Sequence, residues 1–127
     1  MFCNIPGFLA SISKNSYFCE NFNTMQDLTQ TQWKEQLAGD ENAVIIDVRT
    51  ADEISEGYIP NALQMDIYNP HAFMEKAKQL DPEKNYYVYC RSGGRSLQAC
   101  AVLRSIGVAN TYNLLGGFSE WDGETTN

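Results

Sequence analysis

The hydrophobic positions of the chain form short runs of β-branched and aromatic residues, separated by segments with helical spacing. The clearest runs are 43–48 (AVIIDV), 86–90 (YYVYC) and 111–115 (TYNLL). A continuous apolar run of this length is typical of a strand buried on both faces, as in a parallel sheet. These three runs therefore predict strands, and a brief further strand is predicted at 62–65.

Helices are predicted between these strands. Thr29 and Gln32 have the spacing of a capping box, in which each side chain bonds a free amide of the other residue. The helix that they begin should stop at Gly39, where a left-handed residue costs little. Helices are also expected from Asn69-Pro70 to Leu80 and at 97–106, and a short helix or turn is expected at 50–56 and again around Phe118 and Trp121. Alternating strands and helices predict an α/β fold, a mainly parallel central sheet with helices on both faces.

The length of 127 residues fits one domain. The first apolar run is broken by Pro6-Gly7 and has no basic leader, so it lacks the usual form of an export signal. We expect residues 1–24 to be a loosely ordered N-terminal extension and residues 25–127 to form the domain. A cleaved export signal is the alternative interpretation of the extension.

Charge narrows the classes of partner. The net charge of −7 argues against a nucleic-acid partner, which requires basic residues to neutralise phosphates. No run of eighteen apolar residues is present, so we expect no membrane partner. The chain has four arginines, and two of them, Arg91 and Arg95, lie in one short stretch. A locally positive loop in an acidic protein predicts a site for a small anion.

The four cysteines, Cys3, Cys19, Cys90 and Cys100, do not have the spacing of metal ligands, and the lone histidine, His71, has no ligand partners nearby in sequence. We therefore predict no metal and no other cofactor. Four cysteines are also too sparse for a disulfide-stapled secreted scaffold. The expected compartment is reducing, hence the cytoplasm.

Cys90 is the candidate nucleophile, because it falls between the end of a predicted strand and the start of a helix. Ligands of open α/β sheets bind at such places. The loop that follows contains two glycines, whose freedom lets consecutive amides curl around an anion. A helix N-terminus and nearby arginines lower the pKa of a cysteine. The sequence therefore predicts a preformed thiolate in a cradle of amides. The cradle residues are Arg91, Ser92, Gly93, Gly94, Arg95 and Ser96.

Four segments carry a family resemblance. The stretch YYVYCRSGGRS resembles the active-site loop of rhodanese-like sulfurtransferases, and IIDVR at 45–49 resembles the D-V-R strand of that family. The segment 57–62 (GYIPNA) is similar to its G-H-I-P-G-A segment, although Tyr58 stands where histidine is frequent. The segment 114–121 (LLGGFSEW) is similar to its closing G-G-x-x-x-W. The resemblance covers about residues 26–122.

The resemblance implies a thiosulfate sulfurtransferase in which Cys90 accepts sulfane sulfur as a persulfide. Arg91 and Arg95 would attract a small anionic donor such as thiosulfate. The acceptor would be cyanide, a small thiol or a protein thiol. Asp47 and Arg49 match positions that support the fold near the site, and we interpret them as an ion pair or as loop-capping hydrogen bonds.

Two other functions remain open. A Cys-based phosphatase or arsenate reductase also places a thiolate before an arginine, but with five intervening residues, whereas four separate Cys90 from Arg95. A non-catalytic rhodanese-like binding module is the second alternative, although such a module would be expected to lose the cysteine or its cradle.

Other polar and sulfur-containing residues are expected to be structural. We expect Cys100 to pack in the core, and His71 to lie on the surface. The tyrosines at 86, 87 and 89 should pack within the sheet. Asp52, Glu53 and Glu56 are expected to form a solvated acidic face, and contact with a basic partner is the alternative interpretation.

Overall fold

The computed structural model describes residues 24–127, which form five strands, four α-helices and one 3₁₀ helix. The predicted extension, apart from Thr24, lies outside the described residues. In chain order the elements are β1 (Thr24–Leu28), α1 (Gln30–Ala38), β2 (Ala43–Asp47), α2 (Ala51–Ile54), β3 (Leu63–Gln64), α3 (Pro70–Ala77), β4 (Asn85–Tyr89), α4 (Gly94–Ser105), β5 (Asn110–Leu114) and η1 (Phe118–Glu120).

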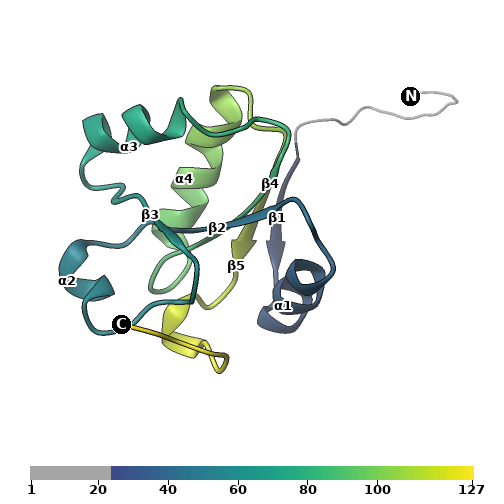
Figure 1. Cartoon of the computed structure of the whole chain (residues 1–127), viewed down its shortest axis with the longest axis vertical. Helices are drawn as coiled ribbons and strands as arrows, with labels where there is room; N and C mark the ends of the chain where they lie inside the picture. Colours follow the sequence, from purple (N-terminus) through teal and green to yellow (C-terminus); the bar gives the residue numbers. More distant parts are fainter. Residues whose placement is uncertain (1–23) are drawn as a thin grey trace, which may run out of the picture.

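The strands form one sheet in the order β1-β5-β4-β2-β3, and every neighbouring pair is parallel. Strand β4 lies at the centre, between β5 and β2, and the helices surround the sheet (Figure 1). The predicted α/β class and the parallel sheet are therefore confirmed. No helix in the described part of the chain is both long and apolar enough to cross a bilayer.

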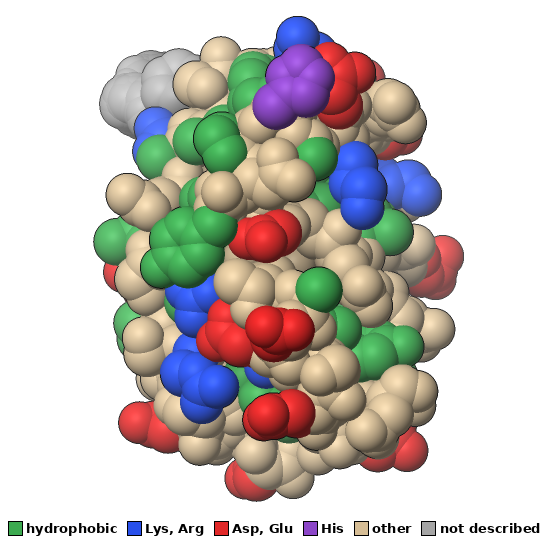
Figure 2. Space-filling view, turned by 90° about the vertical axis from the view of Figure 1, so that its left-hand side faces the viewer, with side chains coloured by type: hydrophobic (Ala, Val, Ile, Leu, Met, Phe, Trp, Pro, Cys, Tyr) green, Lys and Arg blue, Asp and Glu red, His purple; other side chains and the backbone are tan. Residues whose placement is uncertain are grey.

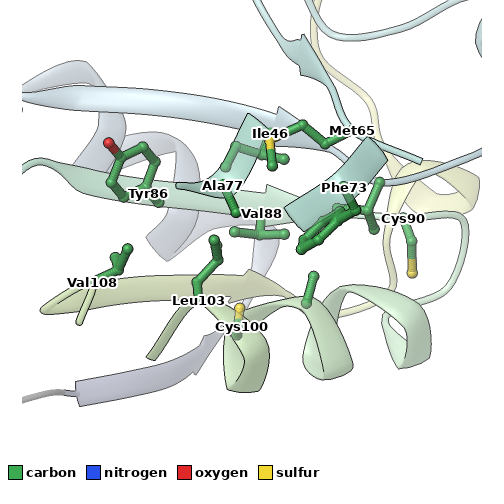
Figure 3. Packing of buried hydrophobic residues seen from close by; sticks show 12 residues of the cluster. Ile46, Met65, Phe73, Ala77, Tyr86, Val88, Cys90, Cys100, Leu103 and Val108 are labelled. Atoms are coloured by element: carbon green, nitrogen blue, oxygen red, sulfur yellow. The ribbon is translucent and has the colours of Figure 1, made fainter. Parts of the chain in front are cut away.

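Both faces of the sheet are covered. Tyr86 and Val88 of β4 point to one face and pack there against α3 and α4, which contribute Phe73 and Leu103 (Figure 3). Tyr87 and Tyr89 of the same strand belong to a second cluster on the opposite face, built around Trp33 of α1. Each face thus buries alternate residues of one strand, which explains why its sequence is apolar from Tyr86 to Tyr89. The prediction of helices on both faces is confirmed.

The helix ends follow the predicted caps, with local differences. The Thr29–Gln32 capping box is formed, and Gly39 is the C-cap that follows the last residue of α1, although with φ −99 rather than in the left-handed conformation. Helix α3 is capped by Asn69, as predicted, but ends at Ala77. Helix α4 begins at Gly94, three residues before the predicted start at Leu97. Its first turn contains a glycine, which has a weak helix preference, so the sequence pattern there favoured a loop.

Strand β1 was not predicted. Its sequence, TMQDL, contains no continuous apolar run, and it begins one residue before the predicted domain boundary. The strand pairs only with β5, along its whole length from Thr24 to Leu28. An edge strand is covered less completely than a central one, and Gln26 and Asp27 are exposed here. The pairing with β5 therefore determines its conformation more than a local pattern does.

Candidate active site

Cys90 immediately follows the last residue of β4, at the carboxyl edge of the sheet, and α4 begins four residues later at Gly94. Gly93 is the N-cap of α4 and has φ 115, which a residue with a side chain rarely adopts. This conformation turns the chain from the strand into the helix within three residues. The predicted place of Cys90 between a strand and a helix is thus confirmed.

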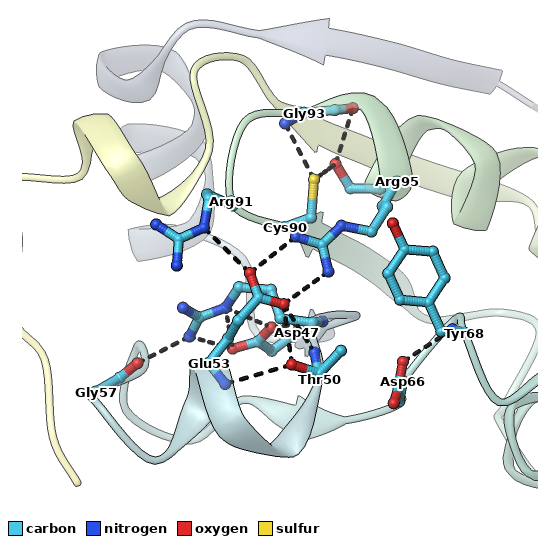
Figure 4. Close-up of polar contacts among 12 residues, drawn as sticks. Asp47, Thr50, Glu53, Gly57, Asp66, Tyr68, Cys90, Arg91, Gly93 and Arg95 are labelled. Carbon is cyan, nitrogen blue, oxygen red and sulfur yellow. Dashed lines mark hydrogen bonds and ion pairs between the residues drawn. The ribbon is translucent and has the colours of Figure 1, made fainter.

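The sulfur of Cys90 lies against hydrogen-bond donors of the loop and of α4. The N–H of Gly93 donates to Sγ at 3.0 Å (Figure 4). The Oγ of Ser96 lies 3.4 Å from Sγ. Burial by itself would raise the pKa of Cys90. The hydroxyl of Ser96 and the backbone N–H groups of Ser96, Gly93 and Ser92 outweigh it, so the pKa lies below the usual value. The site therefore favours a thiolate, which is the nucleophilic form of cysteine.

The back of the loop is held by the segment after β5. The N–H of Phe118 donates to the carbonyl of Cys90 at 2.8 Å, and the N–H of Ser119 donates to the carbonyl of Arg91 at 2.9 Å. Gly117 has φ 59 and passes so close to these two carbonyl groups that a Cβ atom would collide with them. The two glycines before Phe118 therefore permit the contact that fixes the loop. Sequence similarity indicated this segment but not its contacts.

The two loop arginines share one carboxylate. Arg95 donates two hydrogen bonds to Glu53, of 2.7 and 2.9 Å, and Arg91 donates one of 3.2 Å (Figure 4). The hydrogen bonds from Arg95 in particular hold the pKa of Glu53 far below its usual range. The guanidinium of Arg95 also lies 5.2 Å from the centre of the Tyr68 ring. The two arginines and Glu53 together carry one net positive charge.

The expectation of a solvated face at α2 is wrong for Glu53. Its side chain is only 17% exposed, because a capping box with Thr50 directs it over the start of α2 and toward the arginines. Asp52 and Glu56 are exposed, as predicted. A Thr-x-x-Glu spacing was present in the sequence, but the spacing alone does not reveal the contact with Arg91 and Arg95. The face that carries α2 and α3 shows acidic and basic side chains intermixed (Figure 2).

Asp47 and Arg49 form a buried ion pair at the end of β2. Their charged groups are 2.8 Å apart at the closest, and the backbone N–H of Arg49 also donates to Asp47. The guanidinium of Arg49 donates to the carbonyl of Gly57 at 2.8 Å and lies 4.2 Å from the centre of the Phe118 ring. The pair thus contacts both the loop after α2 and the segment that holds Cys90. The ion pair expected from the sequence is present.

Cys100 forms none of the hydrogen bonds described at the sulfur of Cys90. Cys100 of α4 is fully buried in the core, as predicted, and burial raises its pKa to about 11. Cys3 and Cys19 lie outside the described residues. Within residues 24–127, no group of three His, Cys, Asp or Glu side chains could hold a metal ion. Of the remaining loop residues, Ser92 and Gly94 are exposed and Ser96 is fully buried.

Residues 29–124 match the family model of the rhodanese-like domain. The chain belongs to this family. A sulfurtransferase of Allochromatium vinosum is 34% identical over 97 residues, covering 76% of this chain and 88% of the relative. A putative sulfurtransferase of Bacillus subtilis is 37% identical over 101 residues, covering 80% and 94%. A crystal structure of a rhodanese-like domain protein from Staphylococcus aureus superimposes with a TM-score of 0.68 at 29% identity, covering 79% of this chain and 94% of that one.

Tyr58, which stands where the rhodanese-like pattern frequently has histidine, takes part in the structure through its backbone. Tyr58 forms an isolated antiparallel bridge with Thr126, through backbone hydrogen bonds of 2.9 and 2.8 Å. The bridge fastens the C-terminal segment to the loop after α2. Tyr58 contributes backbone groups to it, so the identity of its side chain does not alter this contact. Family membership and the names of the relatives support sulfur transfer as the general activity.

Proposed function

We propose that the protein is a sulfurtransferase that carries sulfane sulfur as a persulfide on Cys90, with thiosulfate as a donor. The observation that carries the proposal is the position of Sγ among the N–H groups and the hydroxyl that lower its pKa. Membership of the rhodanese-like family supports the same chemistry. A reducing compartment such as the cytoplasm would keep Cys90 in the required thiol state.

In the first half of the reaction the Cys90 thiolate attacks the outer sulfur of thiosulfate. A new S–S bond forms at Sγ, the S–S bond of thiosulfate breaks, and sulfite leaves with the bonding electron pair. The N–H groups of Ser92 and Gly93, together with the start of α4, would stabilise the negative charge on sulfur. Arg91 and Arg95 would attract the dianionic donor with the net positive charge left after their pairing with Glu53.

In the second half the thiolate of an acceptor, or cyanide, attacks the outer sulfur of the persulfide. The S–S bond on Cys90 breaks, its electron pair returns to Sγ, and the acceptor leaves as a persulfide or as thiocyanate. The loop regenerates the starting thiolate without an external base. A mechanism without a base is consistent with the contacts described for Cys90, because none of them comes from a histidine side chain.

The two rival functions have less support. The four-residue spacing from Cys90 to Arg95 is shorter than that of the Cys-based phosphatases, and Arg95 is paired with Glu53. An anion-binding arginine in such an enzyme must be available to a tetrahedral oxyanion. A binding module without catalysis would not need the sulfur to be held in a pKa-lowering environment.

The test is intact mass spectrometry after incubation with thiosulfate. The wild-type chain should gain one sulfur atom, and cyanide should remove it. Cys90→Ser should gain none, whereas Cys100→Ser, the matched control at the buried core cysteine, should gain one. Failure of the wild-type chain to gain sulfur from thiosulfate or from any other sulfane donor would overturn the proposal.

A further inference from the structure

A chain of polar side chains runs from β1 to the sulfur of Cys90. The Nδ2 of Asn113 donates to Asp27 at 2.9 Å, and the Oδ1 of Asn113 accepts a hydrogen bond from the Oγ of Ser96. The same Oγ lies 3.4 Å from the sulfur of Cys90. Asp27 and Asn113 are direct neighbours in the register of β1 and β5, which places their side chains together.

The Ser96 hydroxyl has more acceptors than it can serve. Its Oγ lies within hydrogen-bonding distance of Sγ of Cys90, Oδ1 of Asn113 and the carbonyl of Gly93. A hydroxyl carries one hydrogen, so it can donate fully to only one of the three. Ser96 is 0% and Asn113 2% exposed, which leaves little access for water to substitute. The sulfur and the Asn113 amide therefore compete for the same hydrogen.

The Asp27 carboxylate favours one orientation of the Asn113 amide, and this orientation determines whether Asn113 offers Ser96 an acceptor or a donor. A carboxylate only accepts hydrogen bonds, so it attracts the Nδ2 group. The carbonyl of Gly93, 3.4 Å from Nδ2, favours the same orientation. Rotating the amide by half a turn would place Oδ1 against the Asp27 carboxylate. In the observed orientation Asn113 presents an acceptor to Ser96 rather than a donor.

We propose that Asp27 is a positioning residue for Cys90: by holding the Asn113 amide, it keeps a second acceptor beside the Ser96 hydroxyl, so that the hydrogen bond from Ser96 to the sulfur is weakened but not lost. A thiolate that accepts fewer hydrogen bonds is more basic and, at equal ionisation, a stronger nucleophile. The arrangement keeps the thiolate reactive within a cradle that would otherwise stabilise it further. An exposed carboxylate on an edge strand thus acts on the buried sulfur through two intervening side chains.

The test variant is Asp27→Asn, which replaces the carboxylate by a group of the same shape that can also donate. Its amide can donate to Oδ1 of Asn113, so the Asn113 amide can turn and present Nδ2 to Ser96. The sulfur of Cys90 then competes for the Ser96 hydrogen with the carbonyl of Gly93 alone. The pKa of Cys90 should fall by about 0.5–1 unit, the range expected for strengthening one hydrogen bond.

The pKa is measured from the pH dependence of iodoacetamide alkylation, with the modified Cys90 quantified in the tryptic peptide 85–91, which contains no other cysteine. A second readout is the limiting alkylation rate at high pH, where the thiolate is fully formed. It should fall roughly two-fold in Asp27→Asn, because nucleophilicity decreases with pKa. Unchanged circular dichroism and thermal midpoint would show that the variant folds like the wild type.

Removal of a negative charge could lower the pKa of Cys90 by itself, so the experiment is repeated in a Ser96→Ala background. Loss of the hydroxyl removes the connection but leaves the charge change intact. We expect the Asp27→Asn shift to disappear in that background. A shift in the pKa of Cys90 of equal size with and without the Ser96 hydroxyl would show that only the charge of Asp27 matters, and would overturn the proposal. The absence of any shift in the Asp27→Asn variant would overturn it as well.

The other charged or titratable groups around Cys90 do not change in these variants. They are Arg91 and Arg95 of the loop and α4, Glu53 of α2, and Cys100 on the following turns of α4. The identification of Cys90 as the reacting residue rests on the proposed function, but alkylation requires no sulfur donor. A missing pKa shift would therefore contradict the role of Asp27 alone, whereas a missing mass gain with thiosulfate would contradict the proposed function alone.

Discussion

Glu53 and Arg95 form a bidentate pair beside the candidate nucleophile, with hydrogen bonds of 2.7 and 2.9 Å between guanidinium and carboxylate. Their side chains are only 17% and 18% exposed, so solvent weakens the pair less than it would at an open surface. Under the proposed function, an anionic donor approaching Cys90 would have to share Arg95 with a carboxylate that belongs to the protein. Glu53 would then determine how strongly the site attracts anions.

Glu53→Gln should increase the affinity for thiosulfate, because it removes the competing negative charge. Glutamine can still serve as the third residue of the capping box with Thr50, so α2 should remain intact. The KM for thiosulfate should fall about three-fold or more at low salt, and the change should shrink as salt increases. Steady-state assays of thiocyanate formation at two ionic strengths measure both effects.

The matched control for that variant is Asp52→Asn, which removes a carboxylate from the same helix at an exposed position. Its KM should stay close to that of the wild type. An equal decrease in both variants would attribute the effect to net charge, and an unchanged KM in Glu53→Gln would contradict the role of Glu53.

Arg95→Ala should weaken the binding of anionic donors, because it removes one positive charge and leaves Glu53 paired with a single arginine of the two described here, the exposed Arg91. The KM for thiosulfate should rise about ten-fold, the change that corresponds to a loss of about 1.4 kcal/mol. A neutral donor such as an organic trisulfide should be affected less. The double variant Glu53→Gln/Arg95→Ala should recover part of the loss, and equal losses for neutral and anionic donors would contradict this explanation.

The α/β order of the fold could be predicted from the sequence because its signals are local. Strand β4 is apolar at consecutive positions, and the caps Thr29 and Asn69 mark helix starts through contacts only three residues long. Strand β1 lacks such a signal. Its exposed residues Gln26 and Asp27 are polar, and it becomes a strand through pairing with β5, which is more than eighty residues away in sequence.

The candidate site could be predicted only in part for the same reason. Cys90, Gly93 and Ser96 lie in one short segment, so their proximity follows from the sequence. Glu53 reaches that segment from α2 and Asn113 reaches it from β5, through contacts between elements far apart in the chain. Neither residue has a distinctive sequence pattern around it that points to Cys90. Tertiary structure alone brings them to the site.

Gly117→Ala should loosen the loop that carries Cys90. The residue has a positive φ, and a methyl group would collide with the carbonyl groups of Cys90 and Arg91. We expect a loss of about 1–3 kcal/mol in the free energy of unfolding, the usual cost of such strain, and a decrease in sulfur transfer. Denaturant unfolding measures the first and the thiosulfate assay the second.

The control for that variant is Gly39→Ala, at the end of α1, where φ is negative and no atom lies within 4 Å of an added Cβ. Its free energy of unfolding should change by less than about 0.5 kcal/mol. A Gly117→Ala protein as stable and active as Gly39→Ala would show that the close approach of Gly117 to the loop is unimportant.

Asp40 joins the end of α1 to the central strand. Its Oδ2 accepts hydrogen bonds of 2.8 Å from the hydroxyl of Tyr87 and from Nδ2 of Asn85, and its Oδ1 accepts one from the N–H of Asn42. Partial burial raises the pKa of Asp40, but these three hydrogen bonds outweigh it and hold the pKa below its usual range. The ionised form is therefore the one that stabilises the fold.

Asp40→Asn should lower the free energy of unfolding by about 1–2 kcal/mol at pH 7, because an amide nitrogen replaces an accepting oxygen. Since the folded pKa of Asp40 lies below the unfolded value of about 3.9, its contribution is complete above that pH and is lost as pH falls through the folded pKa. The difference between wild type and variant should therefore narrow below about pH 4. Urea unfolding from pH 7 to pH 3 measures this difference in the free energy of unfolding. Glu41→Gln, at an exposed neighbouring position, is the control. A difference between wild type and Asp40→Asn that does not change with pH would contradict the role of the ionised carboxylate.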